Sequence, residues 1–254
     1  MIKMKIESNK LFYNDCLSKL DTHGFYCIEN AISDDDLNIL QSHINYLVSI
    51  HGNKYFSLTN PYLDTGSPFS KIVGDTSFIE LLKKLAELKS GLLLNNSKIL
   101  NILRVVTGSL TKSQSNLYHF DASLVTALVP IIIPNEGALN SGNLVAFPNI
   151  RPLRKSVLIN IFEKILYQNP ITRFILSLYI KKFSNGKHVI TLKPGNIYLF
   201  WGYQTLHANL ENAPNNLRAT LLLHYGNPYD NSILMQYIFK FNRFKDFLRL
   251  KHLK

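Results

Sequence analysis

The sequence is poor in cysteine and contains no long hydrophobic run. Its 254 residues include only two cysteines, Cys16 and Cys27, which provide neither a zinc-binding spacing nor a disulfide framework. No run reaches the roughly 18 apolar residues of a membrane-spanning helix. The opening residues, "MIKMKIESNK", lack the apolar segment of a signal peptide. These absences predict a cytoplasmic protein and leave peripheral contact with a membrane open.

Acidic residues are also scarce, with 17 Asp and Glu against 28 Lys and Arg, a net charge of +11. The excess lies in two segments. Residues 151–187 hold eight basic residues and one acid, and residues 240–254 hold six basic residues and one acid. Such segments are typical of contact with an anionic membrane, or of solvated helix faces. No recognition motif accompanies the charge, so nucleic acid is not an expected partner.

The residues that are present predict a folded chain whose first part, 1–97, is mostly helical. Hydrophobic residues make up 46% of the sequence, well above the content of disordered chains. Helical spacing predicts helices over 11–23, 33–50 and 77–94, with a short strand over 24–32. Ser33 is the expected N-cap of the second helix, with Asp36 in the capping-box position. Residues 52–75, rich in Pro, Gly, Ser and Asn, predict an irregular loop.

The second part, 98–230, is predicted to be mainly β. Short strands closed by Gly, Pro or Asn are expected over 98–109, 118–133, 142–150, 188–200 and 218–226, a pattern typical of a sandwich or barrel. A helical pair over 153–183, divided at Pro170, interrupts the strands. A basic helix is expected at 231–254. We interpret residues 1–254 as a single domain.

The inserted helices of 153–183 have two interpretations. Their first half places Leu158, Ile161, Phe162, Ile165 and Leu166 on one face. That face is compatible with an amphipathic helix on a membrane surface. It is equally compatible with a lid that packs on the barrel over the active site.

His119 and Asp121, in "NLYHFDASLVTALVPI", are the first candidate metal ligands. Residues two apart on a strand point to the same face, and an imidazole nitrogen with a carboxylate oxygen suits iron(II). A second histidine completes the facial triad of two His and one carboxylate. His207, after the strand in "KPGNIYLFWGYQTLH", is the candidate.

Arg218 and Thr220 are a candidate anion site. Arg218 lies in the apolar strand "RATLLLHYG", where a charge needs an anionic partner because burying it alone is costly. Its guanidinium matches a carboxylate in bidentate geometry. Thr220 is on the same face and can add a hydrogen bond.

The order of these motifs resembles the iron(II)/2-oxoglutarate-dependent oxygenases. The resemblance implies a distorted double-stranded β-helix, or jelly roll, with flanking helices. It implies iron(II) bound by His119, Asp121 and His207, and 2-oxoglutarate held by Arg218 and Thr220. "SGNLVAFP" and "LKPGNIYLF" resemble the family's Gly-x-Leu segment and its Pro-Gly strand. Together the resemblance covers about residues 15–228, apart from the insert.

Two branches of this superfamily share features with the chain. "LDTHGFYCIENAISDDDLNILQSHI" looks like the N-terminal module of the phytanoyl-CoA dioxygenase-like branch, whereas "HFDASLVTALV" looks nearer to the prolyl-hydroxylase-like branch. Halogenases of the superfamily replace the carboxylate ligand with a small residue. Since this chain retains Asp121, the resemblance implies hydroxylation, with release of succinate and CO2.

Further residues are candidates for the pocket. Asn116, Tyr118 and Trp201 flank the ligand motifs, and His224 is an even number of residues from Arg218. Arg104 is a buried-looking charge with two interpretations, a second anion contact or a side chain at a sheet edge that extends to solvent. The expected substrate is a small molecule or a lipid-linked compound. The alternative function is a non-enzymatic jelly-roll module that docks on an anionic membrane or partner through the basic segments.

Overall fold

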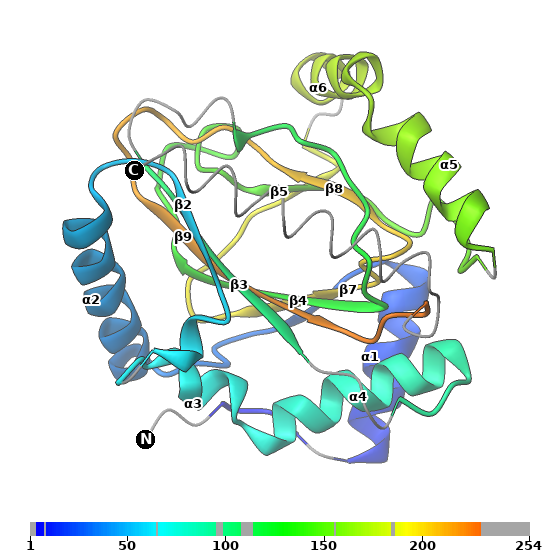
Figure 1. The fold of residues 1–254 in the computed structure, drawn as a ribbon, viewed down its shortest axis with the longest axis horizontal. Coiled ribbons are helices and arrows are strands. Elements are labelled where there is room, and N and C mark those ends of the chain that lie inside the picture. The colour runs from blue at the N-terminus through cyan, green and yellow to red at the C-terminus, as the bar shows by residue number, and fades with distance from the viewer. Residues whose placement is uncertain are drawn as a thin grey trace.

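The computed structural model describes residues 4–7, 9–64, 66–94, 99–107, 114–154, 156–183 and 186–229. The helix expected at 231–254 lies outside these residues. Two antiparallel sheets face each other, with helices on both sides (Figure 1). This is the mainly β architecture with flanking helices, a jelly roll, that the sequence predicts.

The larger sheet has six strands in the order β1-β7-β4-β9-β3-β2. Its strands, in chain order, are β1 (Tyr26–Ile28), β2 (Phe56–Thr59), β3 (Leu100–Val106), β4 (Val125–Ile132), β7 (Ile197–Phe200) and β9 (Arg218–Tyr225). The smaller sheet has the order β6-β5-β8, formed by β5 (Leu144–Phe147), β6 (Val189–Ile190) and β8 (Leu206–Asn209). The two sheets enclose a space between them (Figure 1). The smaller sheet, which includes β8, lies on one side of this space, and β4, β9 and β3 of the larger sheet lie on the other.

Helices of the N-terminal part cover the outer face of the larger sheet (Figure 1). They are α1 (Lys10–Thr22), α2 (Asp34–His51), α3 (Phe69–Val73) and α4 (Thr76–Ser90), and a 3₁₀ turn, η1 (Pro61–Leu63), precedes α3. As expected, Ser33 caps α2, its hydroxyl oxygen accepting a hydrogen bond of 3.2 Å from the Asp36 amide. Buried residues such as Leu40 and Leu82 pack with Leu221 of β9 in one core, which fixes the sheet against the helices.

Three sequence-based expectations differ from the structure. The segment 188–200 is not one strand, because a turn at Pro194 and Gly195 divides it into β6 in the smaller sheet and β7 in the larger sheet. Residues 52–75 are not an irregular loop, because Phe56–Thr59 pair with β3 as an edge strand; the pairing overrides weak local propensity. The segment 118–133 is also not one strand. β4 begins only at Val125, so His119 and Asp121 precede it rather than sharing its face.

The predicted insert forms a helical hairpin beside the smaller sheet. It consists of α5 (Val157–Gln168) and α6 (Pro170–Phe183), with Pro170 at the first position of the second helix, where a missing amide hydrogen costs little. Ile180 of α6 packs with Val145 of β5 and Leu206 of β8. No helix among the described residues is long and apolar enough to cross a membrane.

Candidate metal centre

His119 and His207 are brought together by backbone pairing. Each donates its amide hydrogen to the other's carbonyl oxygen, at 2.9 and 3.0 Å, in an isolated bridge between the segment before β4 and strand β8. The Asp121 amide donates to the carbonyl oxygen of Gly202, at 3.0 Å. These bonds hold two segments that are far apart in sequence beside one another.

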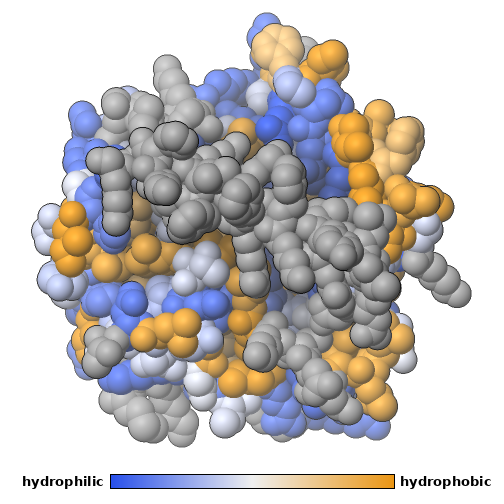
Figure 2. Space-filling model, viewed as in Figure 1, coloured by the Kyte–Doolittle hydropathy of each residue, from blue (hydrophilic) through white to orange (hydrophobic). Residues whose placement is uncertain are grey.

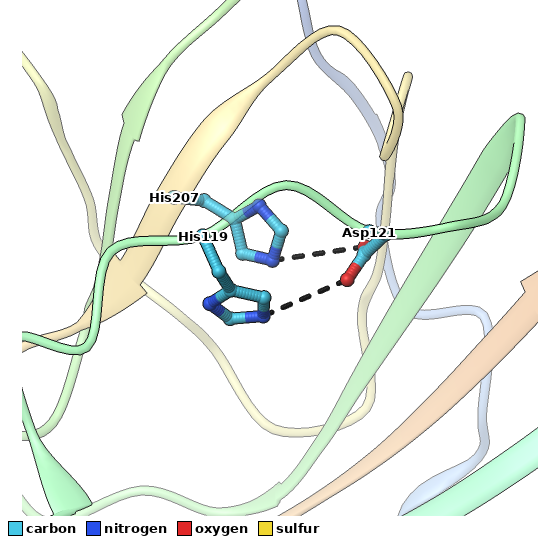
Figure 3. A group of neighbouring side chains, drawn as sticks. All are labelled: His119, Asp121 and His207. Atoms are coloured by element: carbon cyan, nitrogen blue, oxygen red, sulfur yellow. Dashed lines mark ion pairs between the residues drawn. The ribbon is translucent and has the colours of Figure 1, made fainter. Parts of the chain in front are cut away.

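The three side chains converge on one point (Figure 3). The Nε2 atom of His119 lies 3.6 Å from Asp121 Oδ1, and that of His207 lies 3.7 Å from Asp121 Oδ2. Both distances exceed a hydrogen bond, yet two ligands that each lie about 2.1 Å from one ion are at most about 4.2 Å apart. These two distances lie within that limit, and the three donor atoms, all within 4.8 Å of one another, form a group that could hold a metal ion.

Backbone carbonyls fix the tautomers that metal binding requires. His119 Nδ1 lies 2.8 Å from the carbonyl oxygen of Leu117, and His207 Nδ1 lies 3.1 Å from that of Thr205. A carbonyl only accepts, so each Nδ1 carries the hydrogen. The lone pair of each Nε2 therefore faces the centre. The hydrogen bond from each Nδ1 to its carbonyl oxygen also fixes the orientation of the ring.

The charges of the centre also suit a cation. Burial lowers the pKa of His119 to about 3, with His207 acting in the same direction, so His119 is neutral near pH 7, the form that binds metal. Burial alone would raise the pKa of Asp121. The surrounding His207, His224 and His119, with a hydrogen bond from Thr126, outweigh burial and lower it, so Asp121 is an anion.

A network of polar side chains fixes the position of the Asp121 carboxylate. Thr126 on β4 donates a hydrogen bond of 2.5 Å to Asp121 Oδ2, and His224 Nδ1 lies 3.6 Å from the same oxygen. The Ser123 hydroxyl lies 3.1 Å from Thr126 Oγ1 and 3.2 Å from His224 Nδ1. Only His224 had a sequence signal, its even spacing from Arg218. Thr126 and Ser123 had none, because short polar residues near a strand are common.

Arg218 is a buried cation at the start of β9. Its side chain donates to the Gly142 carbonyl at 2.7 Å, to Thr220 Oγ1 at 3.3 Å and to Asn209 Oδ1 at 2.8 Å. Within the part of the chain that the structure describes, no carboxylate pairs with it. Burial, with Arg104 nearby, lowers its pKa to about 9, so the guanidinium is charged at pH 7 and its charge is not neutralised by the protein.

Comparison with known proteins identifies the fold. No protein-family model matches the chain, and no curated protein matches its sequence. Solved structures do match. A prolyl hydroxylase from Trichoplax adhaerens, in complex with a hypoxia inducible factor peptide fragment, has a TM-score of 0.54 and 15% sequence identity, over 85% of this chain and 90% of its own.

Two further structures match over similar lengths. A Pseudomonas putida prolyl-4-hydroxylase has a TM-score of 0.52 and 12% identity, over 89% of this chain and 98% of its own. The non-heme alpha ketoglutarate dependent epimerase SnoN, in complex with Fe3+, alpha ketoglutarate and nogalamycin RO, has a TM-score of 0.57 and 10% identity, over 86% of this chain and 85% of its own. The chain has the fold of the iron- and 2-oxoglutarate-dependent oxygenases.

A cavity in this oxygenase fold adjoins His119. It measures about 80 Å³ and is lined by Tyr55, Arg104, Val106, Gln114, Leu117, His119 and Asn209. Arg104 lies opposite Thr220 in the register of β3 and β9, so both side chains point between the sheets. Asn209, which sequence reasoning missed, lines this cavity and also accepts the hydrogen bond from Arg218. It stands two residues after His207 on β8, and that even spacing could have indicated it.

Three of the proposed pocket residues, Asn116, Tyr118 and Trp201, lie elsewhere in the oxygenase fold. The Asn116 amide nitrogen turns to Glu211, 3.4 Å away. Tyr118 is next to His119 in the chain, but its side chain packs in the core that the smaller sheet forms with α6. Trp201 belongs to the core beneath the N-terminal helices and donates to Asp21 at 2.8 Å. The structure does not bring these side chains to the cavity.

Replacing Gly202 with alanine should weaken metal binding. A Cβ there would lie 2.3 Å from Thr126 Oγ1 and 2.7 Å from Asp121 Oδ2, so the carboxylate must move. We expect a loss of roughly 1–3 kcal/mol in stability and weaker binding of iron(II), measured by anaerobic calorimetry. Gly66→Ala is the control. Gly66 has φ +79°, so alanine there also strains the backbone, but its Cβ meets nothing within 4 Å, so that variant should keep its metal affinity. Equal affinities in the two variants would contradict this account of Gly202.

Proposed function

We propose that the protein is an iron(II)- and 2-oxoglutarate-dependent dioxygenase that hydroxylates a small-molecule or lipid-linked substrate in the cytoplasm, with release of succinate and CO2. Residues 1–254 form its single oxygenase domain in this proposal. The observation that carries it is the convergence of His119, Asp121 and His207 in a fold that also buries the unneutralised Arg218.

Two different sets of residues would bind the metal and the cosubstrate. His119, Asp121 and His207 would hold iron(II), and Arg218 with Thr220 would hold the distal carboxylate of 2-oxoglutarate. When bound, iron and 2-oxoglutarate supply the oxidation of a substrate C–H bond by dioxygen. The protein would supply the geometry that places the two groups beside the substrate.

Several residues keep this arrangement in place. Gly142 has φ +64°, and a Cβ there would lie 2.4 Å from Arg218 Cδ. Glycine at this position therefore leaves room for the Arg218 side chain. The Gly142 carbonyl and Asn209 then orient the guanidinium. Thr126 and His224 fix Asp121 in the same way. Preorganised charges of this kind bind a charged ligand without the cost of rearranging.

Iron(II) and 2-oxoglutarate should together raise the melting temperature more than either does alone. One end of 2-oxoglutarate would contact the metal and the other Arg218, so each ligand favours the binding of the other. Anaerobic thermal unfolding measures this, and slow formation of succinate in air measures turnover. If neither ligand shifts the melting temperature, the proposal fails, and the non-enzymatic binding module becomes the better interpretation.

A further inference from the structure

The hairpin of α5 and α6 presents an apolar surface to solvent. Ten of its large apolar side chains have exposed fractions between 38% and 73%. On α5 they are Leu158, Ile159, Phe162, Ile165 and Leu166, and on α6 they are Ile171, Phe174, Ile175, Leu178 and Tyr179. We call this set the hairpin face. Apolar side chains gather along the edge of the molecule where these helices lie (Figure 2).

The orientation of α5 is the reverse of that of an ordinary surface helix, which buries its apolar side. Its one fully buried residue is Asn160, which accepts a hydrogen bond of 3.0 Å from Arg151. Glu163, on the same side, forms an ion pair of 3.3 Å with Arg151. The side of α5 that packs on the protein is therefore mixed, with Asn160 and Glu163 between Val157 and Tyr167, and its most apolar side is left exposed for another surface. A lid with its apolar side against the barrel, one of the two interpretations of the sequence, does not describe this helix.

The charges near the hairpin face are positive. Glu163 is the only acidic residue between 156 and 187, and it is committed to Arg151 and Arg154. Lys182 and Lys187 are exposed, and Lys182 continues the exposed stripe of α6 one turn beyond Leu178. Lysines beside an apolar stripe can extend to anionic headgroups while the stripe enters the bilayer boundary.

Charge complementarity distinguishes the occupants that would cover this face. A second copy of the chain carries +11, and residues 240–254 carry six basic residues and one acid. Either would bring positive charge toward positive charge, which disfavours association. We propose that the hairpin face docks on an anionic lipid membrane, with its apolar side chains at the headgroup boundary. This proposal does not rest on the proposed oxygenase chemistry.

The test is flotation of the full chain with phosphatidylcholine vesicles, with and without about 30% phosphatidylserine. We expect binding to the anionic vesicles that weakens as salt rises from about 50 to about 500 mM. Phe162→Ser with Phe174→Ser should reduce binding at least about tenfold, because both rings leave the bilayer. The matched control is Tyr46→Ser with Ile50→Ser, equally exposed on α2, which should bind like the unchanged protein.

A charge variant separates the two contributions. Lys182→Glu with Lys187→Glu should weaken binding to anionic vesicles severalfold, whereas Lys54→Glu with Lys71→Glu, at exposed sites elsewhere, should have little effect. The melting temperature of the Phe162 and Phe174 variant should match that of the unchanged protein, because the two side chains are 67% and 65% exposed. No vesicle contains iron or 2-oxoglutarate, so the result is independent of the oxygenase assay.

Four outcomes would overturn the proposal. The first is no binding to anionic vesicles at low salt, and the second is an equal loss in the α2 control. The third is a dimer of the unchanged protein that the Phe162 and Phe174 variant abolishes, since a second copy would then cover the face. The fourth is a clearly lower melting temperature of that variant, since the chain's own residues would then cover it.

Discussion

Alanine at His207 or His119 should abolish iron(II) binding and succinate formation. In the proposed centre each ring would supply one of three ligand atoms, because its Nδ1 hydrogen bond to a backbone carbonyl leaves only Nε2 for a metal. Removing one of three protein ligands should reduce affinity by at least about 100-fold, more than the 10–100-fold typical of outer contacts. Anaerobic calorimetry with iron(II) measures the first effect, and succinate release the second.

The control for these variants is His23→Ala. His23 is exposed at the end of α1, away from the centre, so its loss should change neither measurement. Circular dichroism should show that the His207→Ala protein remains folded, because the ring makes no direct hydrogen bond to Asp121. Unchanged iron affinity in either ligand variant, in a folded protein, would exclude this centre as the metal site.

Replacing Arg218 with leucine should remove the response to 2-oxoglutarate and spare iron binding. The guanidinium is 1% exposed and lacks a carboxylate partner among the described residues, so a bound dicarboxylate would supply it. Truncating one member of a buried charge pair costs about 2–5 kcal/mol. We therefore expect 2-oxoglutarate affinity to fall by about 100-fold or more, measured as the loss of its added thermal shift in the presence of iron(II).

Arg151 offers a matched control for Arg218. It is also buried, at 2% exposure, but it already pairs with Glu163 and donates to the Tyr203 carbonyl at 2.7 Å. Arg151→Leu should therefore lower stability and leave the 2-oxoglutarate response intact. If both leucine variants lose that response equally, the effect is a general destabilisation and Arg218 is not the carboxylate anchor.

Local sequence predicted most elements because their signals are local. The Ser33 cap and the apolar spacing of α2 depend on neighbours three and four residues away, and both appear as predicted. The edge strand β2 was missed because only its pairing with β3 makes it a strand. The same limit applies to Thr126 and Ser123, which are recognisable only from the side chains they contact.

The prediction that His119 and Asp121 lie on one face of a strand shows a second limit of sequence reasoning. The sequence placed both residues in β4, where spacing by two would align them. In the structure they precede β4, and the alignment comes from the backbone pairing of His119 with His207 and from the bond of the Asp121 amide to Gly202. The proximity was predicted, but its predicted cause was wrong.

The sequence by itself determined the fold class, the residue types able to hold iron(II) and a dicarboxylate, and the basic character of the insert. Those properties depend on composition, periodicity and motif order, all readable along the chain. The tertiary structure alone decided that three donor atoms converge, that Arg218 is buried without an anion, and that α5 turns its apolar side outward. The first two depend on contacts between segments far apart in the chain, such as His119 with His207 and Arg218 with Gly142. The helical period of α5 defines an apolar face without defining which way that face points.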